Sequence, residues 1–178
     1  MTPTAMNPIE CPDDDDGVRE RVGYFSGQLL DVDDLRREQD YFLAKARRHN
    51  RMLHGWGVVS GLEVSVEVSV DGATHLVVEP GYALDACGNE IVVPTPVVVD
   101  VPDDRGTVVA VRFKDAVVGA GRVRDSFAVQ LIDDRGEPWV VLATLTSDDT
   151  GTCDDAGTRD DASAWAVDCS VRRPLGLD

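Results

Sequence analysis

Positive charge is scarce in this sequence of 178 residues, which contains only two lysines, Lys45 and Lys114. Lysine and arginine together number 17, against 33 aspartates and glutamates, and the formal net charge at pH 7 is −16. A chain this acidic repels the phosphates of nucleic acids and of anionic membrane surfaces. We therefore expect no nucleic-acid partner, and the acidic surface mainly favours solubility.

The sequence also lacks long apolar runs and closely paired cysteines. No hydrophobic segment approaches the roughly 20 residues that span a bilayer, so we expect no membrane insertion, and the N-terminus has no signal-peptide pattern. The cysteines form no C-x-x-C pair, and Cys87 is interpreted as a small turn residue. We expect cytoplasmic synthesis and assembly with reduced thiols, or an extracellular location within a released particle. A disulfide between Cys153 and Cys169 is the minor alternative, and Cys11 has no predicted partner.

Motifs for catalysis, metals and cofactors are absent as well. His49 and His54 are five residues apart and lack the H-E-x-x-H pattern of zinc proteases. The acidic residues at 31–34 lack the glycine and glutamate positions of a calcium loop, and predict a helix start instead. Ser60 lies outside a G-x-S-x-G elbow. We therefore expect no enzymatic activity, no catalytic residues, no cofactor and no metal.

One amphipathic helix is predicted for residues 32–53, a stretch without glycine or proline. Apolar and small residues recur there at three- or four-residue spacing on one side. The glycines on either side of Trp56 end the helix. The opposite side is basic in an otherwise acidic protein, so its arginines are candidate interface residues: Arg36, Arg37, Arg47 and Arg48.

The chain divides into three regions. Residues 1–20 contain three prolines and four consecutive aspartates, and are predicted to form a flexible arm that orders only against a partner. Residues 21–57 hold an apolar segment and the helix. Residues 58–178 form an antiparallel β domain with a polar loop at 146–162, and the tail at 172–175 is predicted to leave that domain.

Apolar and polar residues alternate from 62 to 70, which predicts a half-buried strand. Asp71 and Gly72 form a favoured hairpin turn, after which residues 75–79 return beside the first strand. We therefore predict an α+β fold, mainly β, with one long N-terminal amphipathic helix packed on an antiparallel β meander, sandwich or partial barrel. The remaining strands are predicted at 82–85, 90–93, 97–101, 107–113, 126–132, 139–145 and 164–168.

Aromatic residues make up only 6% of the chain, and a few stand at informative places. Aromatic side chains carry a large apolar area, so they anchor elements to a core or to a partner. Trp56, at the junction of helix and sheet, is interpreted mainly as a core anchor. Tyr24 and Phe25 suit either role, and with Leu29 and Leu30 they are assigned to the candidate interface.

Several motifs together form a recognisable set: Y-F-S-G-Q-L-L at residues 24–30, D-L-R-R-E-Q-D-Y at 34–41, and L-H-G-W-G-V-V at 53–59. With P-G-Y-A-L-D at 80–85 and G-N-E-I-V-V at 88–93, they resemble a phage-tail-like protein family. Its members recur in gene clusters for extracellular contractile injection systems and related tailocins. The resemblance extends over residues 21–175, and the first block is its most specific part.

The resemblance implies a structural subunit of a contractile particle, of the baseplate, fibre-attachment or cap-adaptor type. Such a subunit would dock on baseplate, spike, cap or fibre proteins through its arm and helix, as one of several identical copies. Two other classes stay open from the sequence. A ligand- or carbohydrate-binding β module would need exposed aromatics on a sheet face, and an enzyme would need histidines and acidic residues around one pocket.

Overall fold

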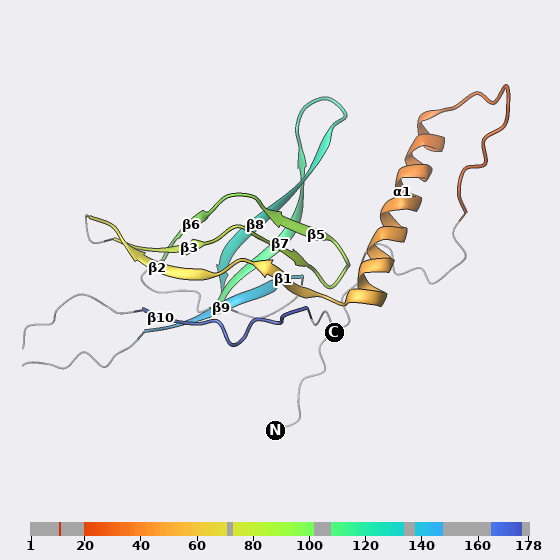
Figure 1. Ribbon diagram of the computed structural model, residues 1–178. Helices are drawn as coiled ribbons and strands as arrows, with labels where there is room; N and C mark the ends of the chain where they lie inside the picture. Colours follow the sequence, from red (N-terminus) through yellow and green to blue (C-terminus); the bar gives the residue numbers. More distant parts are fainter. Residues whose placement is uncertain are drawn as a thin grey trace, which may run out of the picture.

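The computed structural model describes residue 11 and residues 20–70, 73–101, 108–133, 138–147 and 165–175. This part of the chain holds one long helix and ten strands in three open antiparallel sheets (Figure 1). The predicted α+β, mainly β fold class is therefore confirmed. Figure 1 shows the sheets gathered into one body, with the helix standing to one side of it.

The helix α1, Val32–His49, begins at a reciprocal cap. The Asp34 backbone N–H donates to the Asp31 carboxylate at 2.9 Å, and the Asp31 N–H donates back to the Asp34 carboxylate at 3.4 Å. The helix continues as the π-helical segment η1, Asn50–His54, and ends at Gly55, whose φ is 77°. The predicted helix is thus confirmed, with a wider last turn than the sequence indicated.

The strands predicted from alternation and turn signals are all present. β2 and β3 form the predicted antiparallel pair, in which Val64 faces Val78; their turn at 71–72 lies outside the described residues. One strand, β1 (Gly57–Gly61), was not predicted, because its glycines obscure the alternation. The sheets are β1, β4 (Gly81–Leu84) and β5 (Glu90–Val93); β2 (Val64–Val68), β3 (Thr74–Val78) and β6 (Val97–Asp100); and β10 (Trp165–Asp168), β9 (Val140–Ser147), β7 (Val108–Val117) and β8 (Val123–Ile132).

One aliphatic core joins the three sheets. Ile91 from the first sheet, Leu76 from the second and Leu142 from the third are each fully buried. Leu62 is also fully buried although its φ is 60°, a conformation that strains any residue with a side chain. Burial of the leucine side chain offsets that strain. Of the loop predicted at 146–162, only the residues that end β9 are described.

The tail at 172–175 does not leave the domain, so that prediction was wrong. The Val58 N–H donates to the Arg173 carbonyl at 2.8 Å, and the Leu175 N–H donates to the Val58 carbonyl at 2.9 Å. The Arg172 guanidinium donates to the Gly61 carbonyl. β1 lies at the edge of its sheet, where its backbone groups lack a second strand. The tail supplies partners that a sequence pattern cannot reveal.

A disulfide joins Cys11 to Cys87 across 76 residues, with the two Cα atoms 5.2 Å apart and both cysteines buried. The expectation of reduced thiols was therefore wrong for this pair. Sequence spacing gave no sign of it, because the partners are so distant along the chain. Cys169 is a free thiol, and Cys153 lies outside the described residues. Of the predicted arm the structure describes residues 11 and 20, and Cys11 ties it to the β domain.

Gly57→Ala should destabilise the protein. Gly57 has a φ of 141°, and an added Cβ would collide with the Arg173 carbonyl oxygen. We expect the free energy of unfolding in urea to fall by about 1–3 kcal/mol, the usual cost of a strained backbone conformation. The control is Gly23→Ala, where a Cβ meets nothing within 4 Å. Equal unfolding midpoints for the two variants would contradict the observed seating of the tail on β1.

Replacing both Cys11 and Cys87 by serine should lower the free energy of unfolding by about 2–5 kcal/mol, because the open chain gains conformational entropy when unfolded. Reductant should produce the same loss in the unaltered protein, measured by urea unfolding. Cys169→Ser serves as the control, since that thiol is free. If reductant leaves the midpoint unchanged, the disulfide does not form in solution.

Candidate docking surface

The segment before α1 folds back on itself in a defined turn. The Gln28 N–H donates to the Phe25 carbonyl at 3.1 Å, and the Phe25 N–H donates to the Gln28 side-chain oxygen at 3.3 Å. Gly27 takes a φ of 88°, which a turn of this kind requires of its third residue. The turn explains the glycine and glutamine of the Y-F-S-G-Q-L-L motif. It brings the extended segment back alongside the helix (Figure 1).

Tyr24 fastens this segment to α1. Its phenolic O–H donates to the Glu38 Oε2 at 2.5 Å. This hydrogen bond raises the pKa of Tyr24, because the carboxylate favours the neutral phenol, and burial and the negative charges of Glu38 and Asp34 raise it further. Residues 24–30 and α1 therefore form one element, with the aromatic segment held against the helix.

The apolar face of α1 is not covered by the β domain. Leu35, Phe42 and Leu43 are 49%, 58% and 51% exposed. Ala44, the buried residue of the helix, is nine residues from Leu35, about two and a half turns, and so lies on the opposite side. The amphipathic pattern predicts this apolar face, but the predicted packing on the sheet does not extend to it.

Contacts between helix and β domain are found at the last turns of the helix. The Asn50 side-chain amide donates to the Gly88 carbonyl at 3.0 Å. Gly88 lies so close to the Arg47 carbonyl that a Cβ there would collide with it. The predicted packing of the helix on the sheet therefore holds for its C-terminal end, and the rest projects (Figure 1).

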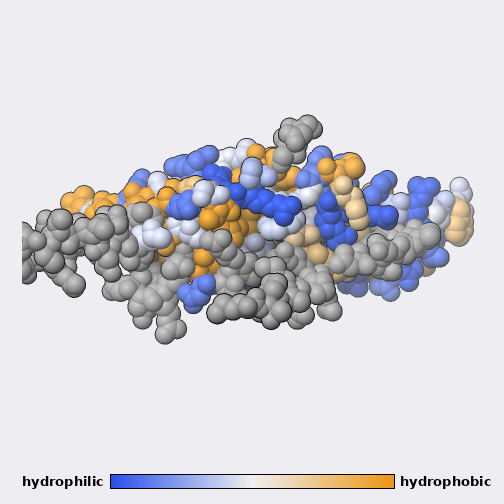
Figure 2. Space-filling view, turned by 90° about the horizontal axis from the view of Figure 1, so that it is seen from below, coloured by the Kyte–Doolittle hydropathy of each residue, from blue (hydrophilic) through white to orange (hydrophobic). Residues whose placement is uncertain are grey.

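The exposed apolar side chains continue from the helix onto the preceding segment. Leu29 is 91% exposed, Phe25 69% and Tyr24 50%. A shallow hollow of about 640 Å³ runs along the helix beside them. Figure 2 shows apolar side chains next to charged ones at the right-hand end of the molecule, over α1 and this segment. We call the exposed apolar surface of Tyr24, Phe25, Leu29, Leu35, Phe42 and Leu43 the helix face. The hollow on it is lined by Glu38, Gln39, Phe42, Leu43 and Ala46.

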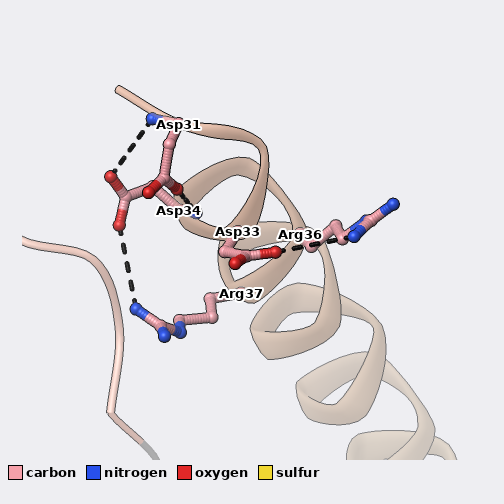
Figure 3. A network of polar contacts seen from close by, with 5 residues as sticks. All are labelled: Asp31, Asp33, Asp34, Arg36 and Arg37. Carbon is pink, nitrogen blue, oxygen red and sulfur yellow. Dashed lines mark hydrogen bonds and ion pairs between the residues drawn. The ribbon is translucent and has the colours of Figure 1, made fainter. Parts of the chain in front are cut away.

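The four predicted arginines do not act as one basic patch. Arg36 pairs with Asp33 at 3.5 Å and Arg37 with Asp34 at 3.8 Å, as Figure 3 shows. Exposed pairs of this kind contribute little to stability, about 0–1 kcal/mol. Arg47 is half-buried at the junction with the β domain, and Arg48 is exposed. Neither Arg48 nor Lys45 makes an ion pair with the described part of the chain.

Trp56 lies away from the helix face. It is half-buried, and the Arg173 guanidinium stacks over its ring with 4.4 Å to the ring centre. A stacked cation of this kind is held by the electrons of the ring face. Trp56 therefore holds the C-terminal tail near β1. The structure brings together Tyr24, Phe25, Leu29 and Leu30 with α1, but not Trp56.

Over the ranges that the structure describes, no helix is both long enough and apolar enough to cross a membrane. Within those ranges, histidine, cysteine, aspartate and glutamate side chains form no group of three or more that could hold a metal ion.

No protein-family model matches this chain, and no curated protein matches it in a sequence search. Among solved structures, the crystal structure of TssK is similar, with a TM-score of 0.51 and 10% identity, over 85% of this chain and 41% of that chain. A chain from the baseplate complex of the type VI secretion system matches with a TM-score of 0.48 and 15% identity. That match covers 85% of this chain and 58% of the other. The chain thus spans about half the length of these proteins, and shares its fold with TssK.

Glu38→Gln should lower the pKa of Tyr24 towards the usual value of 10.0. Because folding raises the pKa of Tyr24, the stabilisation by this hydrogen bond is fully present below the pKa of Tyr24 in the unfolded chain. It is lost as the pH rises through the pKa of Tyr24 in the folded protein. Phenolate absorbance during alkaline titration measures this, with Tyr24→Phe identifying the Tyr24 signal. Glu63→Gln, in the β domain, should leave that signal unchanged. Identical titrations of Tyr24 with and without Glu38 would show that the segment is not held on α1.

Proposed function

We propose that this chain is a structural, non-catalytic subunit of a contractile, phage-tail-like particle, which docks on other particle subunits through its arm and its helix face. The observation that carries this proposal is the exposure of a preformed apolar surface on a projecting helix. Contiguous exposed apolar surface of this kind is typical of protein–protein interaction sites.

Two further observations support the proposal that this chain belongs to a contractile particle. The motifs at residues 24–30 and 53–59 resemble those of phage-tail-like proteins. They also have specific structural roles in this fold: the first builds the turn before α1, and the second ends the helix and starts β1. The fold is also shared with TssK, where the match covers 41% of the chain, so in that protein the same fold is one part of a longer chain.

The geometry suits docking because the surface is rigid before it binds. The cap at Asp31, the turn at Gly27 and the Tyr24–Glu38 hydrogen bond hold the backbone that carries the apolar side chains. This chain then loses less conformational entropy on binding than a flexible segment would. An amphipathic helix that lays its apolar face into a groove is a recurring mode of recognition.

The assembly partners we propose are baseplate, spike, cap or fibre proteins and further copies of this chain. Assembly would take place in the cytoplasm, before release of the particle. A carbohydrate-binding β module is less well supported, because Tyr24, Phe25 and Phe42 are exposed on the helical element, whereas Phe113 and Phe127 of the sheet pack against the core.

Phe42→Asp should remove the protein from the particle. A charge at the centre of an apolar interface loses the buried area and adds a desolvation cost. We expect the amount that copurifies with sheath and tube proteins from the source cells, measured by mass spectrometry, to fall about tenfold or more.

The matched control is Val98→Asp, at a position 61% exposed on β6 compared with 58% for Phe42. Circular dichroism should show that both variants fold. Equal recovery of the two variants in particles would remove the helix face from the proposal, and absence of the unaltered protein from particles would overturn the proposal as a whole.

A further inference from the structure

The disulfide lies at the point where the helix meets the β domain. Cys87 is in the turn after β4, directly before Gly88. The Gly88 carbonyl accepts a hydrogen bond from the Asn50 side chain at 3.0 Å, and an added Cβ on Gly88 would collide with the Arg47 carbonyl. The bond from Cys11 of the arm therefore reaches the residue next to the one that supports the base of the helix.

Apolar packing beneath the base of the helix is incomplete. A cavity of about 200 Å³ lies between η1, the first sheet and the C-terminal tail. It is lined by Asn50, His54, Val59, Tyr82, Leu84 and Leu175. Such a space lacks the close packing of a protein interior, so the surrounding side chains lose contacts there. The base of the helix therefore depends strongly on the turn that carries Gly88.

The turn that holds Cys87 keeps its shape through its own hydrogen bonds. The buried Asp85 carboxylate accepts from the backbone N–H groups of Cys87 and Asn89, at 2.9 and 2.8 Å, and from the Asn89 side-chain amide at 2.8 Å. An aspartate that bonds to the backbone ahead of it in this way stabilises a turn. These bonds do not involve Cys11, so the Cys87 sulfur has its position whether or not the disulfide is formed.

Both cysteines are buried once the bond is closed, with exposed fractions of 8% for Cys11 and 6% for Cys87. A disulfide is reduced when a thiolate attacks one of its sulfur atoms, so the rate depends on access. Small thiols reach buried sulfur atoms only when the protein opens locally. The closed bond should therefore last in surroundings where an exposed disulfide is reduced.

We propose that Cys11 and Cys87 form a redox-controlled closure: both are thiols while the particle assembles in the reducing cytoplasm, and they join after its release. The inference rests on the proposed function, because the arm and the helix are the elements that dock there. Thiols stay reduced in the cytosol, whereas disulfides form and persist in oxidising surroundings. Before closure the arm is available to a neighbouring subunit. After closure it is held at the base of the helix, and the direction of the helix becomes fixed.

A small-molecule disulfide such as oxidised glutathione supplies the oxidant. The Cys11 thiolate attacks one of its sulfur atoms, the small S–S bond breaks, and one small thiol leaves. The Cys87 thiolate then attacks the Cys11 sulfur of the mixed disulfide, and the second small thiol leaves. The two protons lost by the protein thiols are taken up by the leaving thiolates. Two protein thiols are thus oxidised while one small disulfide is reduced to two thiols.

The purified full-length protein tests whether closure stabilises the base of the helix. Oxidised glutathione should join Cys11 to Cys87 in the reduced protein, which peptide mass spectrometry detects. Closure should slow hydrogen exchange of the amides at 46–50 about tenfold or more, because local opening becomes rarer, and should leave β3 unchanged. Cys11→Ser should keep the fast exchange under oxidising conditions, and Cys169→Ser should close normally. No bond formation, or equal exchange at 46–50 in the two forms, would overturn the inference.

Alkylation with N-ethylmaleimide tests when the bond closes. In intact source cells both Cys11 and Cys87 should be alkylated, and in released particles they should be joined. Dithiothreitol should reduce the joined pair about tenfold or more slowly in the folded protein than in urea. A bond already closed inside cells, or open thiols in released particles, would overturn the inference and leave the proposed function standing. Absence of the protein from particles would instead overturn the proposed function, and with it the release step of this inference.

Discussion

The aliphatic core of the β domain closes without any residue of α1. The position of the helix and the exposure of its apolar face follow from this constraint. The buried residues of the core cluster come from the strands and from Leu62. The contacts that the helix makes with the β domain lie at its last turns, where Asn50 and Arg47 meet Gly88. Its apolar face is therefore directed to solvent, where a stable isolated domain would not place it.

The junction at the base of the helix gives this projecting element a fixed direction. Asp85 is buried and accepts hydrogen bonds from the Cys87 and Asn89 backbone N–H groups, at 2.9 and 2.8 Å, which shapes the turn after β4. That turn carries both the disulfide to Cys11 and the Gly88 carbonyl that receives the Asn50 amide. Local polar groups in a turn of the sheet thus determine where the helix points.

Local signals in the sequence were sufficient for the helix, its cap and most strands. The aspartates at 31–34 and the alternation from 62 to 70 act through neighbours a few residues away. The features that sequence reasoning missed involve distant partners: Cys11 with Cys87, and Val58 with the tail at Pro174. The direction of the helix face was missed for a related reason. An amphipathic pattern shows that a face will be covered, but not whether the cover belongs to the same chain.

Two choices in the sequence are unfavourable for a single copy: the uncovered face of α1 and the directly opposed Asp115 and Asp125 in the hairpin of β7 and β8. Each costs little alone, because exposed apolar side chains and surface charges are common on proteins. Natural sequences are otherwise locally consistent, and departures from consistency concentrate at functional sites. Both lie on elements that project from the β domain and expose apolar side chains to solvent. Covering these surfaces in an assembly would remove both costs, which gives a physical reason for the chain to retain them.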